Sequence, residues 1–451
     1  IRQAPRSVVM RLKTKRSEEE AILYDAMYDE GFAGVCLRAI ERRQHLKTER
    51  GELVGTRTNA FRDIGIERGG RVDVLRAEQT NTSINYGDRM IMKLFRRLEP
   101  GINPDLEIGR FLTAAGFKHS PRVTGAIEYR RGTQEPITLA VMNEYIVKES
   151  DAWEYTLDTL RDFLDKTMAL SDEVSAPPPT ASTFMRLSEE EPPPLAIETI
   201  GGFLESARLL GIRTAEMHAA LGSGGPNSAF AAEPYTPHYL RGLYQSLRNM
   251  TTNNFGLLAR YVRENESTMP EAAHAIVLEE QVLAHFRRLT GKQMSSSRIR
   301  AHGDYHLGQV LYTGNDFVIT DFEGEPSRTI TERRIRRSPL RDVSGMLRSF
   351  SYAVHTALQE LRASGLEGAP EERARQWGRF WEAWVCSTFL RAYLDEAKRS
   401  KTLVADWAEI ELLLDVFMLE KVVYEIGYEL NNRPDWLVVP LSGLLEMVKT
   451  E

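Results

Sequence analysis

The segment 299–326 holds the side chains with the clearest catalytic potential. Two acidic sites lie near its ends, and the first has a histidine before it and an amide after it: His302, Asp304, Gln309, Asp321 and Glu323. Between them, two short apolar runs around Gly314-Asn315-Asp316 predict a β-hairpin over 310–319. A hairpin of this size would hold the two acidic sites at its two ends.

Phosphoryl transfer from ATP needs this combination of groups. One carboxylate accepts the proton of the attacking hydroxyl, while an amide oxygen and a second carboxylate hold the magnesium ion that neutralises the phosphates. Asp304 suits the first role, and Gln309 and Asp321 suit the second, with Glu323 close by. The competing interpretation is a structural hairpin with acidic turns.

The spacing of these groups is typical of kinases. Protein kinases carry H-R-D-x-x-x-x-N followed by D-F-G, and this chain carries H-G-D-x-x-x-x-Q followed by D-F-E. The H-G-D triplet matches the aminoglycoside-phosphotransferase branch of the kinase-like fold rather than the protein kinases. The sequence therefore predicts a bilobal α+β fold of this kind, with an N-terminal cap and a mostly helical C-terminal lobe.

A second predicted hairpin, over 72–95, would carry the nucleotide. Its return strand contains Lys93 between apolar neighbours, an unusual place for an unpaired charge. In kinases a strand lysine contacts the ATP phosphates and pairs with a glutamate on the next helix, and Glu107 is the expected partner here. The alternative is a lysine that reaches water from an edge strand and a surface glutamate.

The flanking segments supply candidate contacts to the rest of ATP. The stretch 79–83 lacks glycine, so it would bind phosphates through backbone N–H groups and hydroxyls, which belong to Thr80, Thr82 and Ser83. A buried-type strand is predicted over 137–142. The residues after it have backbone groups that would pair with adenine: Glu144, Tyr145 and Ile146.

Near the C-terminus, Lys421, Tyr424 and Tyr428 lie at positions i, i+3 and i+7, so they share one face of a predicted helix. Aromatic rings beside hydrogen-bonding groups suit a sugar, whose apolar ring faces stack while its hydroxyls bond to fixed polar groups. Helical tyrosines are more often part of a core. The pattern gains its meaning from the catalytic segment.

Other polar residues are predicted to support the site. Asp342 begins a predicted helix and could cap it and brace the catalytic segment. His218, in a predicted helix over 203–221, is interpreted as a satisfied structural histidine rather than a substrate ligand. The arginine-rich stretch 328–341 is expected to pair with acidic neighbours or with a product phosphate.

Composition limits the class of protein. The 451 residues, 42% hydrophobic and 27% charged, fit a globular protein of two or three domains. A formal net charge of −6 gives no reason to expect nucleic acid as a partner. The two cysteines exclude a disulfide scaffold, and no apolar run has membrane-spanning length. We therefore expect a cytoplasmic protein that binds neither nucleic acid nor membrane.

The chain is expected to contain three parts: an N-terminal cap (1–66), an N-terminal lobe (67–147) and a helical C-terminal lobe (148–451). In the cap, the sequence predicts a strand over 7–13 and a helix that opens at the capping-box pattern Ser17–Glu20. The cap could equally be the first layer of the N-terminal lobe, because periodicity alone does not separate the two. A proline-rich, acidic insertion over 173–195 predicts a solvated loop.

The same motifs resemble those of bacterial maltokinases over almost the whole chain. Five stretches carry the resemblance: Gln79–Ser83, His302–Gln309, Thr320–Pro326, Arg337–Val343 and Tyr428–Pro434. Maltokinases have a kinase-like fold with an N-terminal cap, and they transfer the γ-phosphate of ATP to the anomeric hydroxyl of maltose for α-glucan synthesis from trehalose. The resemblance implies a maltose kinase that uses ATP and Mg²⁺.

Carried onto the matching positions, the resemblance gives each site residue a role. Asp304 would be the catalytic base, Gln309 and Asp321 would be magnesium ligands with Glu323 beside them, and Lys93 and Glu107 would form the nucleotide ion pair. Maltose would be bound by His302, Asp304, Lys421, Tyr424 and Tyr428.

Two departures from the family pattern concern the whole protein. The Arg-Trp-Phe element that usually starts the cap is absent from this chain, and the phosphate loop has Thr80 where serine is commoner. The chain also begins with isoleucine. We therefore expect a truncated chain, or the C-terminal part of a fusion with trehalose synthase, which would otherwise be a partner.

The sequence leaves three functions open. The first is a maltose kinase, the second is a kinase for another small sugar or an aminoglycoside, and the third is a non-catalytic regulator of trehalose synthase. The complete set of Lys93, Asp304, Gln309 and Asp321 argues against the third. The face around Lys421 favours a sugar over a polycationic aminoglycoside, which carboxylates would be expected to meet.

Overall fold

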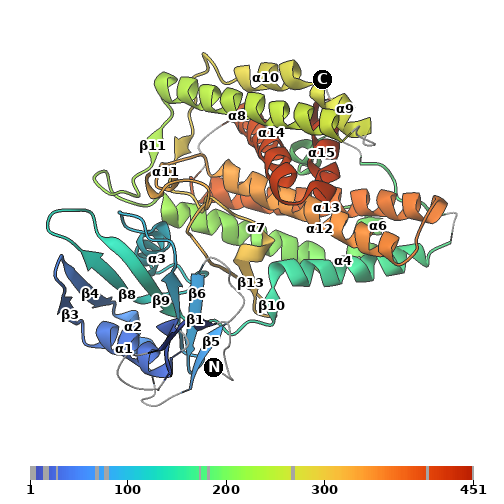
Figure 1. Ribbon diagram of the computed structural model, residues 1–451. Coiled ribbons are helices and arrows are strands. Elements are labelled where there is room, and N and C mark those ends of the chain that lie inside the picture. The colour runs from blue at the N-terminus through green and yellow to red at the C-terminus, as the bar shows by residue number, and fades with distance from the viewer. Residues whose placement is uncertain are drawn as a thin grey trace. The chain divides into compact units, whose positions relative to one another are not determined.

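The computed structural model describes residues 7–13, 20–26, 29–66, 71–75, 81–171, 174–179, 183–265, 270–402 and 406–448 (Figure 1). They fall into two compact units by internal contacts. The first unit contains residues 1–147 and 320–334, and the second contains residues 148–319 and 335–451. The catalytic segment therefore divides between the units directly after its hairpin.

The first unit contains an antiparallel sheet of seven strands in the order β3-β4-β8-β9-β7-β6-β5. The strands are β3 (His45–Lys47), β4 (Glu52–Arg57), β5 (Val72–Leu75), β6 (Asn81–Tyr86), β7 (Met90–Phe95), β8 (Val123–Arg130) and β9 (Ile137–Glu144). The helices of this unit are α1 (Glu30–Glu41), α2 (Ala60–Ile64), α3 (Pro104–Ala115) and α11 (Ile330–Arg333).

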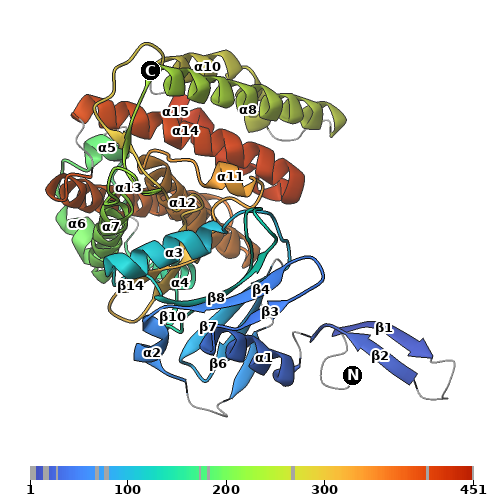
Figure 2. The same ribbon diagram turned by 90° about the vertical axis from the view of Figure 1, so that its left-hand side faces the viewer.

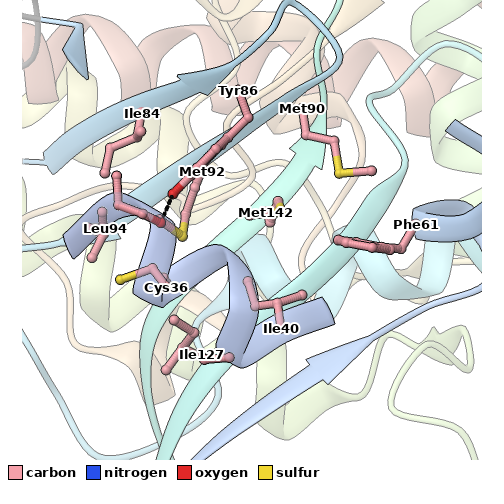
Figure 3. Close-up of a cluster of buried hydrophobic side chains, with 13 residues drawn as sticks. Cys36, Ile40, Phe61, Ile84, Tyr86, Met90, Met92, Leu94, Ile127 and Met142 are labelled. Carbon is pink, nitrogen blue, oxygen red and sulfur yellow. Dashed lines mark hydrogen bonds between the residues drawn. The ribbon is translucent and has the colours of Figure 1, made fainter. Parts of the chain in front are cut away.

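Both faces of this sheet are covered, and alternation along the strands assigns each residue to one of them. In β9, Ala140 and Met142 belong to a core that includes α1, whereas Val141 belongs to a second core that includes Leu106 of α3. Figure 3 shows Cys36 of α1 among the side chains of the first core. The central strands are therefore held rigidly from both sides.

The N-terminal region differs in part from its prediction. Strand β1 (Val8–Lys13) is confirmed, but β2 (Glu20–Tyr24) pairs with it where a helix was predicted. The capping-box residues before Glu20 lie outside the described residues. Hydrogen bonding to β1 overrides the local helix signal. Beyond this hairpin, β3 and β4 pair into the same sheet as β5 to β9, so the sheet continues across the expected boundary at residue 66.

The second unit is mostly helical. Its longer helices are α4 (Ala152–Met168), α7 (Gly202–Leu221), α8 (Pro237–Glu264), α12 (Leu340–Ala363), α13 (Ala369–Arg399), α14 (Trp407–Asn432) and α15 (Val438–Val448). The shorter ones are α5 (Phe184–Leu187), α6 (Pro194–Ile200), α9 (Pro270–Ile276), α10 (Glu279–Arg287), η3 (Leu307–Gln309) and η4 (Pro434–Trp436). Figure 2 shows α12 and α14 in this helical unit.

The proline-rich insertion is more ordered than the predicted loop. Residues 174–179 have no regular structure, but α5 follows, begun by the Thr183 side chain, which accepts a hydrogen bond from Arg186 N. Pro194 starts α6 from the N1 position, where its missing N–H costs nothing. The insertion therefore ends by nucleating helices rather than by extending a loop.

Three short strands form a small sheet in the second unit, in the order β10-β13-β14: β10 (Ser150–Asp151), β13 (Val310–Tyr312) and β14 (Phe317–Ile319). A separate pair joins β11 (Glu233–Pro234) to β12 (Ser297–Arg298). Among the described helices, none has both the length and the apolar character needed to cross a membrane.

Candidate active site

The predicted catalytic hairpin is confirmed. Val310 pairs with Ile319 and Tyr312 with Phe317, and the turn between them contains Gly314 at φ +91°. Asp304 lies before this hairpin, in the loop that ends in η3, and its side chain is partly exposed. The hairpin thus presents the H-G-D loop at its entrance and the D-F-E segment at its exit, as the spacing predicts.

Helix α12 holds the catalytic loop through one stripe of its surface. Asp342 Oδ2 accepts from His302 N at 2.8 Å, and its Oδ1 accepts from Gly303 N at 2.9 Å. At Gly345, a side chain would come within 2.5 Å of the Tyr305 carbonyl oxygen, so the loop lies directly on the helix. Leu307 N donates to Ser349 Oγ at 3.1 Å. The expected brace by Asp342 is confirmed, although Pro339 rather than Asp342 is the N-cap.

Behind Asp342 lies a fully buried histidine. His218 Nε2 is 3.0 Å from Asp342 Oδ2, and His218 Nδ1 is 3.0 Å from the Tyr393 hydroxyl. An ionised carboxylate only accepts, so Nε2 carries the proton and donates. A neutral ring then accepts from the Tyr393 O–H through Nδ1, which satisfies every group. The interpretation of His218 as a satisfied structural histidine is therefore supported.

The loop itself is shaped by local backbone contacts. Gly303 has φ +87°, a region that favours glycine, and Asp304 N points to His302 Nδ1 at 3.4 Å. The Tyr305 hydroxyl is 2.8 Å from Thr214 Oγ1 inside the core. Gln309 ends η3, where its N–H donates to the His306 carbonyl. His302 is buried by these contacts, while Asp304 keeps solvent access.

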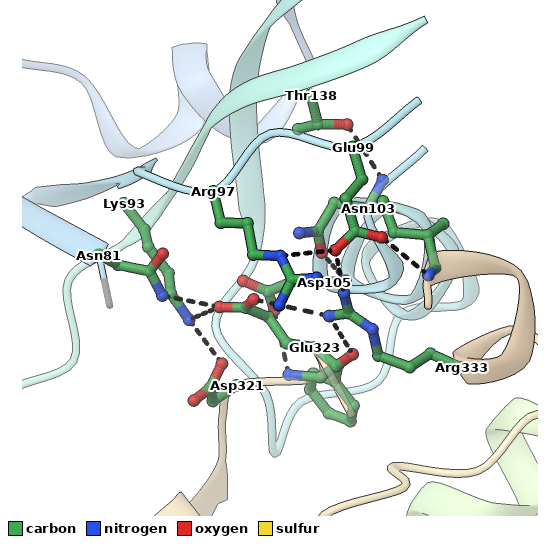
Figure 4. Close-up of polar contacts among 12 residues, drawn as sticks. Asn81, Lys93, Arg97, Glu99, Asn103, Asp105, Thr138, Asp321, Glu323 and Arg333 are labelled. Carbon is green, nitrogen blue, oxygen red and sulfur yellow. Dashed lines mark hydrogen bonds and ion pairs between the residues drawn. The ribbon is translucent and has the colours of Figure 1, made fainter. Parts of the chain in front are cut away.

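In the first unit, Lys93 lies in a cluster of carboxylates. Its ammonium is 2.5 Å from Asp321 and 2.5 Å from Glu323. Figure 4 shows the lysine between these two carboxylates. Asp105 of α3 is a third acidic neighbour. Burial opposes the charge of Lys93, but the attraction of the three carboxylates raises the pKa of its ammonium. One lysine is thus shared among three acids.

The predicted partner of Lys93 is wrong. Glu107 is held by Arg334, whose Nε and Nη2 donate to its two carboxylate oxygens at 3.0 and 2.9 Å. Residues 105 and 107 lie about 200° apart around a helix, so only one of them can face the lysine. Asp105 takes that position. Periodicity predicted the acidic helix but not which of its carboxylates faces the strand.

The D-F-E segment is held in an unusual backbone conformation. Asp321 has φ +63°, in the left-handed region, and Gly324 follows at φ +73°. Asp105 Oδ1 accepts from Phe322 N at 3.1 Å, and Arg333 donates to the Glu323 carbonyl at 3.3 Å. Strain of this kind persists only where the surroundings fix it. Asp321 is therefore oriented by its neighbours rather than by its own preference.

Glu323 has a structural role in addition to its expected place near a metal. Its Oε1 accepts from Asn81 Nδ2 at 2.9 Å and lies 2.5 Å from Lys93 (Figure 4). This contact ties the D-F-E segment to the first residue of β6. A side chain of β6 thus takes part in the site, which the sequence did not indicate.

The expected phosphate-loop hydroxyls have different positions. Thr80 lies outside the described residues, in the connection between β5 and β6. Thr82 and Ser83 are buried within β6, and Thr82 Oγ1 accepts from Arg96 Nε at 2.9 Å. Strand β6 begins at Asn81, so Thr82 lies inside the strand rather than in the loop before it. Its hydroxyl is already hydrogen-bonded to Arg96 of the same unit.

At the end of β9, the backbone is partly used by its own sheet. Glu144 N donates to the Arg122 carbonyl and Tyr145 N donates to the Arg89 carbonyl, both at 2.9 Å. The Glu144 carboxylate forms a two-bond pair with Arg122. Of the three residues whose backbone groups were predicted to meet adenine, Glu144 and Tyr145 thus donate their N–H groups within the first unit, and Ile146 becomes the better candidate.

The predicted face of α14 is confirmed. Tyr424 and Tyr428 stack with ring centroids 6.3 Å apart, and the Lys421 ammonium lies 5.1 Å from the centre of the Tyr424 ring. Tyr428 is about half exposed. The structure extends this face to η4, where the Arg433 guanidinium lies 5.6 Å from the Tyr428 ring and 4.9 Å from that of Trp436. Trp436 in turn stacks on Tyr352 of α12, a partner that no sequence pattern signals.

The arginine-rich stretch pairs with acidic neighbours, as one of its two interpretations predicted. Five of its arginines pair with carboxylates of their own unit: Arg328 with Glu325, Arg333 with Glu99, Arg334 with Glu107, Arg336 with Glu233, and Arg341 with Glu420.

Comparison with solved structures agrees with this architecture. A glucosamine kinase structure matches 94% of this chain and 88% of its own with a TM-score of 0.66 at 20% identity. A second, of a glucosamine kinase with glucosamine, ADP and inorganic phosphate, has the same TM-score at 21% identity. The predicted fold, an aminoglycoside-phosphotransferase-like kinase fold with a helical C-terminal region, is therefore confirmed.

Curated relatives point to the same group of proteins. A glucosamine kinase from Streptacidiphilus jiangxiensis is 27% identical over 375 residues, which cover 82% of this chain and 72% of the relative. A glucosamine kinase from Mycolicibacterium smegmatis is 25% identical over 81% of this chain and 77% of its own length. No family model matches the chain. The superfamily predicted from the H-G-D motif is thus supported, while maltokinase is not singled out.

Proposed function

We propose that this protein is an ATP-dependent sugar kinase that phosphorylates a hydroxyl of a small sugar. The observation that carries the proposal is the held catalytic loop: Asp342 fixes the backbone of His302 and Gly303, and Asp304 stays open to solvent. A base that must meet an incoming hydroxyl needs this combination of fixed backbone and free carboxylate. The glucosamine kinases among the relatives support the acceptor class.

In the proposed mechanism, Asp304 accepts the proton of the acceptor hydroxyl. The acceptor oxygen forms a bond to the γ-phosphorus of ATP while the bond from that phosphorus to the bridging oxygen breaks, and ADP leaves. Lys93 would contact the phosphates from β7. Its three carboxylate neighbours hold it in place, and the phosphate oxygens of ATP would compete with them for it.

The residues present fit a magnesium ion. Carboxylate and amide oxygens are the ligands Mg²⁺ prefers, and Asp321, with Gln309 and Glu323, would supply them. Around Lys93 the acidic side chains outnumber the lysine, which leaves negative charge for a cation to neutralise. When bound, the ion would offset charge on the transferred phosphoryl group. Among the described residues no group of three acidic, histidine or cysteine side chains could hold a metal ion, so the proposal needs ATP oxygens and water to complete the coordination.

Two acceptors are distinguished by separate observations. Glucosamine is favoured by both curated relatives, whose names give it as their substrate. Maltose is favoured by the resemblance of the H-G-D, D-F-E and C-terminal motifs to maltokinases, with transfer to the anomeric hydroxyl. The stacked rings of Tyr424 and Tyr428 would serve either sugar, since each sugar presents apolar ring faces. We favour glucosamine, and maltose is the second candidate. A trehalose synthase partner or fusion belongs to the maltose hypothesis alone.

Phosphorus NMR with ATP and Mg²⁺ tests the proposal directly. Glucosamine, maltose, glucose and kanamycin are supplied in separate reactions, and the coupling of any new phosphate resonance identifies the hydroxyl that received it. The Asp304→Asn variant is the matched control, because it keeps the size of the side chain and removes the base.

Each result separates the candidates. A phosphorylated glucosamine alone supports the favoured acceptor, and maltose phosphorylated at its anomeric carbon supports the second. Transfer to kanamycin alone would keep the kinase and refute the sugar. No transfer to any acceptor, with ATP still bound, would refute a kinase and favour a regulatory role.

A further inference from the structure

Helix α12 contacts two parts of the second unit through two neighbouring stripes. The first stripe consists of Asp342, Gly345 and Ser349, which hold the catalytic loop. The second consists of Arg341, Arg348 and Tyr352. With 3.6 residues per turn the two stripes are separated by roughly a fifth of a turn. One rigid helix therefore carries the loop of Asp304 and, beside it, a second set of polar contacts.

The second stripe forms a ladder of three polar rungs with α14. Arg341 pairs with Glu420, and the Arg348 Nε and Nη2 donate to Glu425 Oε2 at 3.0 and 2.8 Å. The Tyr352 hydroxyl donates to Glu429 Oε1 at 2.9 Å. The rungs follow the same order along both helices. Each rung therefore joins a donor from α12 to a glutamate of α14.

The ladder lies almost entirely out of water. The side chains of the middle rung are 6% and 7% exposed, and the Glu429 side chain is 1% exposed. A side chain on Gly443 of α15 would come within 2.8 Å of Arg348 Nη1, so α15 packs directly against the arginine. The remaining buried surface of α14 is apolar, including Val422, Val423 and Ile426.

Buried ion pairs contribute little to net stability, because desolvation offsets their attraction. They do penalise any other arrangement, since a shifted helix would leave charges buried without partners. Apolar surfaces tolerate small slides and rotations far better. The physical role that suits the ladder is therefore to fix one axial position and one rotation of α14 on α12.

We propose that the Arg341–Glu420, Arg348–Glu425 and Tyr352–Glu429 rungs position α14, and with it the face of Lys421, Tyr424 and Tyr428, relative to the loop of Asp304. This inference rests on the proposed function, in which that face binds the sugar. Arg348 and Glu425 are positioning residues, because they act through α14 and the Tyr352 rung rather than on the substrate. The ladder sets where the acceptor hydroxyl lies relative to the base.

The consequence for activity is specific. A misplacement of about 1 Å lowers the rate of a positioned reaction by about 100-fold, whereas attack on ATP by water needs no sugar face. Loss of the middle rung should thus reduce transfer to the sugar while leaving sugar-independent ATP hydrolysis unchanged. A merely structural role would lower both rates together, in proportion to the folded fraction.

The test removes the middle rung as a pair. The double variant Arg348→Met with Glu425→Met leaves no buried charge without a partner, so it should fold where either single variant might fail to. A milder variant, Arg348→Lys, keeps the charge and one hydrogen bond. Sugar transfer, its sugar KM and ATP hydrolysis without sugar are measured for each full-length protein.

The control is Arg161→Met with Glu360→Met, an exposed ion pair. This pair also joins α12 to a neighbouring helix, here α4, through two hydrogen bonds at 2.8 Å, but it lies outside the ladder. For the middle-rung double variant we expect sugar turnover to fall by about 10- to 100-fold with ATP hydrolysis within about twofold of wild type. Arg348→Lys should recover part of the loss, and the control should lose nothing.

The outcomes distinguish this inference from the proposed function. If the wild-type protein phosphorylates the sugar and the double variant keeps the wild-type ratio of transfer to hydrolysis, the ladder does not position the acceptor, and the kinase assignment stands. An equal fall in both rates would assign the ladder to stability alone and overturn the inference. Absence of sugar transfer in the wild type would overturn both.

Discussion

Asp105 in the first unit and Asp342 in the second are both buried aspartates, yet their surroundings shift their pKa values in opposite directions. Burial, together with the nearby charges of Asp321 and Glu323, raises the pKa of Asp105 to about 7 against the lowering effect of Lys93. Burial also opposes ionisation of Asp342, but the hydrogen bonds that it accepts from His218 and from the Gly303 N–H lower its pKa below the usual value.

The two aspartates differ in the number of hydrogen-bond donors around them rather than in burial. Asp342 accepts from two backbone N–H groups and from His218, and every group around it has a matching partner. Asp105 accepts from Phe322 N and shares one lysine with two other carboxylates. A carboxylate with several donors is a structural anchor, whereas a cluster with excess negative charge is suited to take up a cation.

The largest effect is expected at the third aspartate, Asp304, which neither anchors the fold nor belongs to the buried cluster. Asp304→Asn should lower turnover by about 10²- to 10⁴-fold, because it removes the proposed general base. Its melting temperature should match that of the wild type, because the side chain is partly exposed. Initial rates, ATP binding and thermal unfolding together check this. Near-full turnover in the variant would mean that another group acts as the base.

Asp342→Asn should reduce the stability of the folded protein. The amide nitrogen that replaces one carboxylate oxygen would face N–H donors, so we expect a loss of about 3 kcal/mol in the free energy of unfolding. The wild-type pKa is lowered on folding, so the contribution of Asp342 is present above the unfolded value of about 3.9 and is lost as pH falls through the folded value.

Urea unfolding of both proteins between pH 3 and 8 measures this difference. The difference in free energy of unfolding between wild type and Asp342→Asn should stay constant near neutral pH. It should shrink below about pH 4, where the wild-type carboxyl takes up its proton. A difference that grows toward low pH would contradict the anchoring role.

The comparison also explains what sequence reasoning could reach. The hairpin around Asp304 and Asp321 followed from turn residues and spacing, and the face of Tyr424 and Tyr428 followed from helical periodicity, because both are local. The acidic partner of Lys93 did not, since Asp105 and Glu107 lie in one helix turn and only tertiary packing decides between them. The same holds for β2, whose partner strand overrides its helix signal.

Contacts between elements that are distant in sequence were invisible for the same reason. Glu425 and Glu429 gave no sign in the sequence that Arg348 and Tyr352, about 77 positions earlier, would bind them. The bracing role of Asp342 was predicted because it depends on where a helix begins. What the sequence lacks is the pairing of faces between helices, which arises only when the core is packed.

Asp105→Asn should change how the free energy of unfolding depends on pH, while leaving its value at low pH unchanged. The folded pKa of about 7 lies above the unfolded value of about 3.9, so the folded wild type keeps a proton that the unfolded chain has lost. Wild-type stability therefore falls as pH rises from about 4 to about 7. Asparagine resembles the protonated form and can still accept from Phe322 N.

In the absence of nucleotide and divalent metal, the Asp105→Asn variant should be about 1–3 kcal/mol more stable than wild type at pH 8 and equal to it near pH 4. Denaturant unfolding across this range provides the measurement. Asp162→Asn, at an exposed position of α4, serves as the control and should show a flat difference. If the stability difference between Asp105→Asn and wild type also did not change with pH, the pKa of Asp105 would not be raised on folding, and the prediction would be wrong.

The smallest effect is expected on the proposed sugar face, where an aromatic contact rather than a charge is removed. Tyr424→Ala deletes a ring that stacks with Tyr428 and lies against Lys421. An aromatic contact is worth about 0.5–1.5 kcal/mol beyond its buried area, so we expect the sugar KM to rise about tenfold and turnover to fall less. Steady-state kinetics with the preferred sugar separate the two constants. A fall in turnover at unchanged KM would instead indicate that Tyr424 orients the reacting hydroxyl, and the face would then act with Asp304 rather than as a separate binding surface.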